Sequence, residues 1–288
     1  MEVLTCAANV SEGRRLDVVQ PIAAAADRPP ARLLDVHTDP DHNRSVLTVA
    51  GSPAALVDAI LAAAAVAVET IDVGTHRGVH PRIGAVDVVP YAPLEPGAMP
   101  AAVAAARASA ARLWAELSVP SFLYEDAAGG RPLPEVRRRA FRDLVPDFGG
   151  PGAHPTAGAA VVGAREILVA YNIDLATADV EVAKAIAAEI RESAGGLAHV
   201  RALGLALPSR GITQVSTNVL RPAVTPIGAV FEAVASRAAS HGVRIEGSEI
   251  VGLAPRAALP PRATELALYR PPRVLEDAVA PLAGTGPE

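Results

Sequence analysis

The order of strand-like and helix-like segments is the same in both halves of this 288-residue chain, and that repetition restricts the fold more than any other feature. In the first half, apolar periodicity predicts strands at 2–8, 32–37, 45–50 and 84–91 and helices at 11–26 and 53–69. Ser11 and Ser52 are the expected caps of these two helices. The second half repeats the order, with strands predicted at 166–173, 199–207, 213–220 and 243–253 and helices at 177–193 and 225–242.

Each half therefore has the β-α-β-β-α-β order of a ferredoxin-like unit, which belongs to the α/β (α+β) class. A helix at 97–117, a strand at 121–124 and a short helix at 134–144 extend the first half. Because the helices of such a unit lie on one face of its sheet, we expect two subdomains packed sheet against sheet with a ligand groove between them. The predicted boundary separates an N-terminal subdomain, 1–164, from a C-terminal subdomain, 165–288.

The segment 146–155, Pro-Asp-Phe-Gly-Gly-Pro-Gly-Ala-His-Pro, has too many glycines and prolines for a helix or a central strand. It contains neither the G-x-G-x-x-G nor the G-K-[ST] pattern of a phosphate-binding loop. A flexible loop beside a ligand groove and a plain linker both fit this segment. The tail from about Ala278 is expected to fray.

Composition and charge exclude several classes of protein. The net charge is −5, and no basic stripe interleaved with aromatic residues offers nucleic acid an electrostatic footing. The single cysteine, Cys6, excludes an internal disulfide and a cysteine-built zinc site. The apolar run 59–68 is too short to span a bilayer, and the first residues lack a signal-peptide pattern. We therefore expect a cytoplasmic protein that binds neither nucleic acid nor membranes.

Three polar clusters, at 37–44, 76–82 and 213–218, interrupt the alanine- and valine-rich background. The second is the densest, with two histidines and two arginines in seven residues. Histidine takes a proton near neutral pH, and neighbouring guanidinium groups would bind anions and keep an imidazole neutral. A solvated polar loop is the alternative interpretation of this cluster.

A zinc site built on His76 and His80 is disfavoured. Histidines four residues apart bind one zinc ion when a helix carries both on the same face. Gly78 and Pro81 oppose a helix here, and Arg77 stands where the H-E-x-x-H motif has glutamate. We therefore predict that the chain binds no metal.

The cluster at 37–44 contains turn-forming residues, which account for Pro40 and Asp41. A turn accounts less well for two histidines and an arginine at the ends of two strands. Residue types and spacing alone thus indicate a soluble α/β enzyme with a histidine–arginine site.

An ordered set of short segments resembles the formiminotransferase family, which is found alone in bacteria and archaea and as the front half of a bifunctional animal enzyme. The matching segments are 9–13, 33–36, 43–44, 71–72, 76–78, 80–85, 87–88, 147–149, 214–218 and 251–253. The resemblance implies transfer of a formimino group between 5-formimidoyltetrahydrofolate and L-glutamate during histidine degradation. It also implies two ferredoxin-like subdomains, tetrahydrofolate as co-substrate, N-formimidoyl-L-glutamate as the other product, and a homodimer.

The resemblance assigns roles to individual residues. The family's general base is the second histidine of H-x-G-x-H-P-R, here His80. Animal members have an assisting aspartate where this chain has His37, and Asp39 follows two residues later, so both are catalytic candidates. The folate-contacting stretch maps onto Gly149, Gly150, Pro151, Gly152, Ala153, His154, Pro155, Thr156, Ala157 and Gly158, although most positions between its glycine ends depart from the family pattern. The other binding candidates are Asn43, Arg44, His76, Arg77, Arg82, Gln214, Ser216 and Asn218.

Two other functions stay open at this point. The first is a glutamate formyltransferase that uses a formyltetrahydrofolate, in which the transferred group carries oxygen instead of nitrogen. The second is a folate-binding homologue without catalysis, which the retention of His80, Arg82 and Asn43 opposes.

Overall fold

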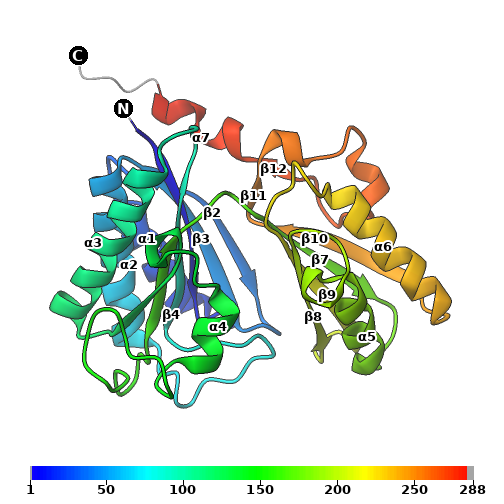
Figure 1. Ribbon diagram of the computed structural model, residues 1–288, viewed down its shortest axis with the longest axis horizontal. Coiled ribbons are helices and arrows are strands. Elements are labelled where there is room, and N and C mark those ends of the chain that lie inside the picture. The colour runs from blue at the N-terminus through cyan, green and yellow to red at the C-terminus, as the bar shows by residue number, and fades with distance from the viewer. Residues whose placement is uncertain (1, 284–288) are drawn as a thin grey trace. The chain divides into compact units, whose positions relative to one another are not determined.

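The computed structural model describes residues 2–283 and forms two compact units that meet at the Arg165–Glu166 peptide bond (Figure 1). Unit 1 precedes this bond and unit 2 follows it. The elements of unit 1 are β1 (Leu4–Val10), α1 (Leu16–Ala26), β2 (Arg32–Asp39), β3 (Arg44–Gly51), α2 (Pro53–Thr70), β4 (Val86–Pro93), α3 (Met99–Leu117), β5 (Ser121–Glu125), the 3-10 turn η1 (Asp126–Ala128), α4 (Leu133–Arg139) and β6 (Ala160–Ala164).

The sheet of unit 1 has the order β2-β3-β1-β4-β6-β5. Its first four strands have the ferredoxin-like arrangement, which confirms the α/β class predicted from the sequence. β6 was not predicted; it lies between β4 and β5 and runs parallel to both. A strand that is buried on both faces has no polar alternation, and the sequence Ala-Val-Val-Gly-Ala has none.

The predicted N-cap of α1 is wrong. Ser11 lies five residues before the helix, and its hydroxyl donates to the carbonyl of Gly84 at 2.7 Å. The carboxylate of Glu12 accepts the backbone N–H groups of Gly13, Arg14 and Arg15 at 2.9–3.0 Å instead. These bonds hold residues 12–15 in a turn and delay the start of the helix to Leu16.

Helices α1, α2 and α3 cover one face of the sheet (Figure 1). α2 is long and apolar enough by composition to cross a membrane, but it packs between α1 and α3 as a core helix. The sequence pattern suggested that the opposite face of this sheet is bare. In the structure, part of that face is covered. Phe122, Tyr124 and Val161 form a second small core there with Val136 of α4, because these apolar side chains point away from α1–α3.

Unit 2 contains β7 (Val169–Leu175), α5 (Val180–Ile190), η2 (Glu192–Ala194), β8 (Val200–Leu207), β9 (Ile212–Val219), α6 (Ile227–Ser240) and β10 (Ile245–Val251). Its antiparallel sheet, in the order β10-β7-β9-β8, is a second ferredoxin-like arrangement. Val215 and Val219 of β9 pack into the core under α5 and α6. Residues 214, 216 and 218 alternate with these valines and therefore lie on the other face of the sheet.

The last part of unit 2 contains β11 (Leu253–Ala254), η3 (Arg256–Ala258), η4 (Ala263–Leu266), β12 (Arg273–Val274) and α7 (Leu275–Ala283). The expected fraying from Ala278 is wrong as far as residue 283, because α7 continues to that point. Residues 284–288, which end the predicted tail, lie outside the described residues. The predicted packing of the two sheets against each other stays a prediction.

Candidate functional site

Polar side chains gather on the sheet face of unit 1 that points away from α1–α3, where β3 begins. Asp39 of β2 stands directly opposite Arg44 of β3, and His37 stands opposite Val46. Asn9 of β1 is the neighbour of Val46 on the other side. Since alternate residues of a strand share a face, His37, Asp39, Arg44 and Asn9 all lie on this one face.

The guanidinium of Arg44 joins this face to the loop 76–82. Its Nε donates to Oδ1 of Asn9 at 2.8 Å, and its Nη2 also donates to that oxygen. Its Nη1 lies 2.7 Å from Nδ1 and 2.9 Å from Nε2 of His80. Burial and the nearby arginines Arg137 and Arg82 lower the pKa of Arg44 to about 10, so it stays a cation at neutral pH.

The contacts of His80 favour one tautomer of a neutral imidazole. The Pro81 carbonyl, an acceptor only, lies 2.9 Å from Nδ1, which therefore carries the proton and donates. Nε2 then carries the lone pair of the ring, and it accepts a hydrogen bond from Nη1 of Arg44. Burial, followed by the charges of Arg44 and Arg137, lowers the pKa of His80 well below its ordinary value. Nε2 is therefore the ring nitrogen with the lone pair, and Arg44 donates to it.

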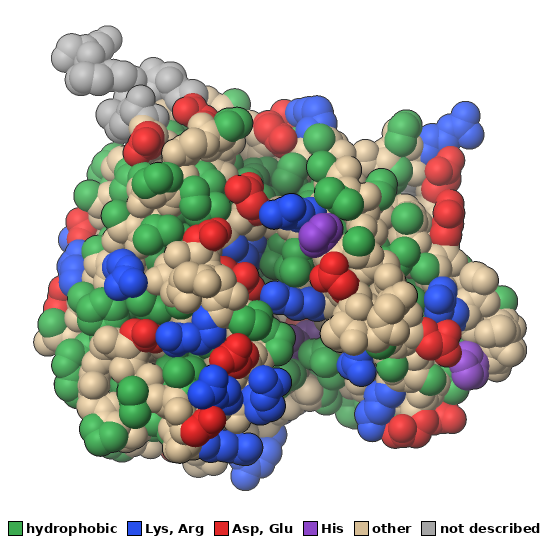
Figure 2. Space-filling view, in the orientation of Figure 1, with side chains coloured by type: hydrophobic (Ala, Val, Ile, Leu, Met, Phe, Trp, Pro, Cys, Tyr) green, Lys and Arg blue, Asp and Glu red, His purple; other side chains and the backbone are tan. Residues whose placement is uncertain are grey.

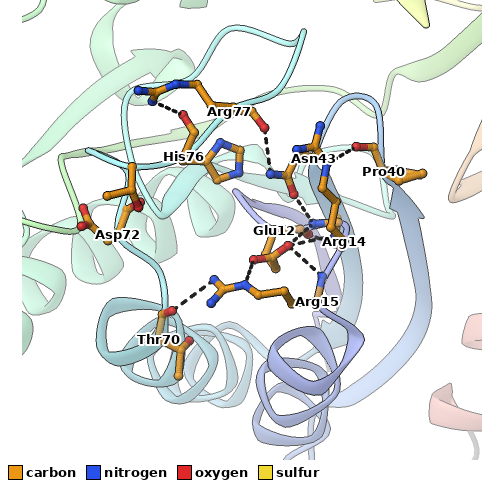
Figure 3. Close-up of polar contacts among 12 residues, drawn as sticks. Glu12, Arg14, Arg15, Pro40, Asn43, Thr70, Asp72, His76 and Arg77 are labelled. Atoms are coloured by element: carbon orange, nitrogen blue, oxygen red, sulfur yellow. Dashed lines mark hydrogen bonds and ion pairs between the residues drawn. The ribbon is translucent and has the colours of Figure 1, made fainter. Parts of the chain in front are cut away.

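Asn43 connects two turns to the loop 76–82 (Figure 3). Its backbone is left-handed, with a φ of 48°, and its side chain is buried. Oδ1 accepts the backbone N–H of Gly13 at 3.0 Å, and Nδ2 donates to the carbonyl of Arg77 at 2.9 Å. Both polar atoms of the Asn43 side chain are thus engaged by the backbone, which makes this residue part of the framework of the site.

Arg82 and His76 lie on the other side of the same loop. Nη1 of Arg82 donates to the carbonyl of Asn43 at 3.0 Å, and its Nη2 donates to the carbonyls of His42 and His80 at 2.8 Å each. Nη1 also lies 2.7 and 2.8 Å from the two ring nitrogens of His76. Burial and the charge of Arg82 lower the pKa of His76, so its ring is neutral and has one nitrogen that can accept from Arg82.

Gly78 allows the loop 76–82 to approach the turn 39–43. A Cβ at this position would lie 2.3 Å from the carbonyl oxygen of His42 and 2.5 Å from Nη2 of Arg82. No side chain fits in this space. The turn itself is closed by Asp39, whose Oδ1 accepts the backbone N–H of His42 at 2.7 Å. The ring of His42 lies 5.5 Å from that of His80 between centroids.

Asp87 and Arg137 hold the residue that follows the loop 76–82, Ile83, in place. Neither was among the predicted site residues. Asp87 is buried; its Oδ1 accepts the backbone N–H of Ile83 at 2.7 Å, and its Oδ2 accepts Nη2 of Arg137 at 2.5 Å. Asp87 lies in one of the segments that match the family, whereas Arg137 gave no signal beyond an arginine run at 137–139. On the face shown in Figure 2, basic and acidic side chains are intermixed, and neither charge forms a continuous patch.

Sequence reasoning also placed no role on Asn9 and Glu12, although both lie in a matching segment. Glu12 is buried and ionised. Burial raises its pKa, but the hydrogen bonds that it accepts from the backbone N–H groups of Arg15 and Arg14 and from the Arg15 guanidinium lower its pKa overall. Its Oε2 accepts Nε of Arg15 at 2.6 Å. The carboxylate thereby fixes the turn whose Gly13 N–H reaches Asn43 (Figure 3).

The glycine-rich stretch 149–158 begins beside Trp114 and ends beside the histidine loop. A Cβ on Gly149, whose φ is 119°, would lie 3.1 Å from the Trp114 ring. At the other end, the N–H groups of Val73 and Ala85 donate to the carbonyls of Thr156 and Ala157. Residues 151–153 between these ends are exposed. The structure thus brings the end of the predicted folate stretch next to the strand that follows His80.

Gln214, Ser216 and Asn218 belong to unit 2 and are described with it. Gln214 is buried, and its Nε2 donates to Oδ1 of Asp174 at 2.8 Å. Oδ2 of Asp174 accepts Nη1 of Arg210 at 2.5 Å and the hydroxyl of Tyr269 at 2.8 Å. Ser216 and Asn218 are half-buried on the same face as Gln214. No group of three or more His, Cys, Asp or Glu side chains suited to a metal occurs among residues 2–283.

Comparison with known proteins identifies the family. Residues 3–165 match the model of the "Formiminotransferase domain, N-terminal subdomain", and residues 170–267 match that of the "Formiminotransferase domain". The chain is 40% identical to a glutamate formimidoyltransferase of Thermoplasma acidophilum and 38% identical to one of Streptococcus pyogenes serotype M1. Each alignment covers 90% of this chain, and 90% and 91% of the two relatives.

A formimidoyltransferase-cyclodeaminase of Gallus gallus is 39% identical over 90% of this chain and 51% of its own length, so the similarity covers about half of that protein. The family predicted from the ordered motifs is therefore confirmed. The chain belongs to the formiminotransferase family.

Proposed function

We propose that this chain is a glutamate formimidoyltransferase, which transfers a formimino group between 5-formimidoyltetrahydrofolate and L-glutamate with His80 as general base. Tetrahydrofolate is then a co-substrate, and the reaction serves histidine degradation. The observation that carries the proposal is the contact of Arg44 with a neutral His80 whose Nδ1–H is held by the Pro81 carbonyl. This arrangement puts the lone pair of the ring on Nε2, where Arg44 holds it until Arg44 turns to a substrate carboxylate.

The reaction begins with the α-ammonium group of glutamate, which must lose a proton before it attacks. Once Arg44 has turned from Nε2 of His80 to a substrate carboxylate, Nε2 takes that proton, and the amine adds to the formimino carbon to form a tetrahedral intermediate. The bond from this carbon to N5 of the folate then breaks, and the imidazolium returns the proton to N5. His80 ends the cycle neutral, as it began.

The lowered pKa of His80 has opposite effects on the two proton transfers. It keeps the imidazole unprotonated at neutral pH, so the base is available in nearly every molecule. It makes removal of the ammonium proton harder, and it makes the imidazolium a stronger acid for protonation of N5. Arg44 therefore favours expulsion of the folate, which is the step that needs an acid.

Arg77 and Arg44 are the proposed ligands for substrate carboxylates. Arg77 is exposed, and within residues 2–283 its Nη1 donates to the carbonyls of Gly74 and His76, at 3.4 and 2.9 Å. The described contacts of Arg44 use three of the five N–H groups of a guanidinium. Both side chains therefore retain donors for a charge-assisted bond to glutamate or to the folate tail.

His37 and Asp39 remain proposed as assisting residues, because they share the sheet face of Arg44. The exposed residues 151–153 of the glycine-rich stretch are proposed to contact folate mainly through their backbone. The polar face of unit 2 with Gln214, Ser216 and Asn218 is proposed as a further binding surface.

The decisive experiment supplies the purified protein with L-glutamate and either 5-formimidoyl- or 5-formyltetrahydrofolate and follows the folate spectrum. Turnover of the formimidoyl compound alone supports the proposal, and turnover of the formyl compound alone assigns a formyltransferase. Tight folate binding without turnover of either would assign a binding protein. His80→Ala should lower kcat by ~10²–10⁴-fold with little loss of folate affinity.

A further inference from the structure

The two terminal nitrogens of the Arg82 guanidinium are engaged by groups of the protein itself. Its Nη2 donates to the carbonyls of His42 and His80, and its Nη1 donates to the carbonyl of Asn43 and faces the ring of His76. The two terminal nitrogens of an arginine carry four N–H groups, and these four partners account for all of them. All three donor distances to carbonyls are between 2.8 and 3.0 Å.

The three carbonyls come from two segments that are remote in the sequence. His42 and Asn43 belong to the turn between β2 and β3, and His80 belongs to the loop before β4. Asn43 makes the reciprocal connection, because its Nδ2 donates to the carbonyl of Arg77. The N–H of Val79 adds a third connection by donating to the carbonyl of Asp41 at 3.1 Å.

A carboxylate ligand needs two parallel N–H groups on one edge of the guanidinium. At Arg82 the N–H groups of both Nη atoms are directed at backbone carbonyls and at His76, so a carboxylate would have to break these bonds first. Arg82 is half-buried, and this burial lowers the pKa of its guanidinium. The side chain is therefore built into the loop framework.

We propose that Arg82 is a positioning residue, which joins the turn 39–43 to the loop 76–82 and so sets the place of His80, and that it does not bind a substrate carboxylate. This role rests on the proposed function in one respect, the assignment of His80 as the base. Lysine at this position keeps the charge but has one nitrogen, which cannot reach all three carbonyls.

The kinetic test compares Arg82→Lys with Arg138→Lys, an exposed arginine of the same unit. Misplacement of the base by Arg82→Lys should lower kcat by about 10²-fold, while KM for glutamate and for the folate should each stay within about threefold. Arg138→Lys should leave all three constants unchanged. A rise in KM for one substrate of tenfold or more at wild-type kcat would overturn the positioning role and indicate a carboxylate ligand.

A second measurement needs no turnover. Hydrogen–deuterium exchange of the substrate-free protein should be faster in both 39–43 and 76–82 in Arg82→Lys, and unchanged in Arg138→Lys. If both segments exchange as in the wild type, the inferred connection is wrong, whatever the activity of the protein. This measurement separates failure of the positioning role from failure of the proposed reaction.

If Arg82→Lys does not fold, a crystal structure of the wild-type protein tests the proposal. A crystal structure with L-glutamate and folinic acid bound should retain the bonds from Arg82 to His42, Asn43 and His80. A substrate carboxylate oxygen within hydrogen-bond distance of either Nη atom would overturn the proposal.

Discussion

Arg44 and His80 are in direct contact, with Nη1 of Arg44 2.7 Å from Nδ1 and 2.9 Å from Nε2 of the imidazole. β3 carries the guanidinium and the loop before β4 carries the ring, so the contact depends on the sheet register. The partner of the His80 imidazole is thus a cation, which lowers the pKa of the ring, whereas a carboxylate partner would raise it. This difference determines how the protein should respond to pH.

Activity should fall on acidification at a pH below the ordinary histidine pKa of ~6.5. Burial and Arg44 lower the pKa of His80, so kcat/KM should rise with pH through that lowered value and be level above it. Arg44→Met removes one of the positive charges, and the acid limb should move to higher pH, towards ~6.5. A pH profile of kcat/KM for the two proteins checks this, and identical limbs would contradict the role given to Arg44.

Replacement of Gly78 by alanine should damage both the site and the stability of unit 1. The added Cβ would lie 2.3 Å from the His42 carbonyl and 2.9 Å from Cβ of Asn43, so the loop must move away from the turn. Overpacking of this kind costs about 1–3 kcal/mol, and kcat should fall with it.

Gly74→Ala is the matched control in the same loop, because its nearest neighbour would be the exposed Asp72 side chain at 3.1 Å. Its free energy of unfolding should stay within about 0.5 kcal/mol of wild type. Urea denaturation and steady-state kinetics measure both variants, and equal behaviour of the two would show that the close approach at Gly78 is unimportant.

Folate binding should change the fluorescence of Trp114, which is the single tryptophan of the chain. Gly149 begins the predicted folate stretch, and a Cβ there would press on Pro120 at 2.9 Å and on the Trp114 ring at 3.1 Å. Gly149→Ala should therefore shift the emission and weaken folate binding about tenfold, because the start of the stretch must move away from Pro120 and Trp114. The strain at a φ of 119°, about 1–3 kcal/mol, should lower the stability of the protein in addition.

Gly97→Ala provides the control for backbone strain alone. Gly97 also has a positive φ, 89°, but a Cβ there would have no neighbour within 4 Å. Its variant should lose some stability and keep both the emission and the folate affinity of wild type. A Gly149→Ala protein with wild-type folate affinity would remove the glycine stretch from the binding site.

Much of the fold could be predicted because its signals are local. β9 was expected at 213–220 and lies at Ile212–Val219, since the β-branched residues 213, 215, 217 and 219 alternate with the more polar residues 214, 216 and 218. β6 could not be predicted, because it is buried on both faces and carries no alternation. The first helix was started too early, because Ser11 looks like a cap and nothing local shows that Glu12 takes the N–H groups of the turn.

Less of the site could be predicted, because its contacts join distant parts of the chain. Polar density drew attention to His80, Arg82 and Asn43, but their partners follow from the sheet register. Arg44 reaches His80 across 36 residues, and Arg137 reaches Asp87 across 50. Backbone carbonyls, which hold Arg82, have no sequence signature at all.

Removal of the Asp174 carboxylate should destabilise unit 2 more than loss of an ordinary surface charge. Asp174 is buried and accepts bonds from Gln214, Arg210 and the Tyr269 hydroxyl. Breaking a fully buried ion pair costs about 3–5 kcal/mol, but Arg210 is 42% exposed and can turn to water. We therefore expect Asp174→Ala to lower the free energy of unfolding by about 2–3 kcal/mol, mainly because the buried Gln214 amide loses its acceptor. Asp179→Ala, which removes only the N-cap of α5, should cost about 1 kcal/mol. Equal losses in urea denaturation would mean that the Asp174 cluster is no more than a surface ion pair.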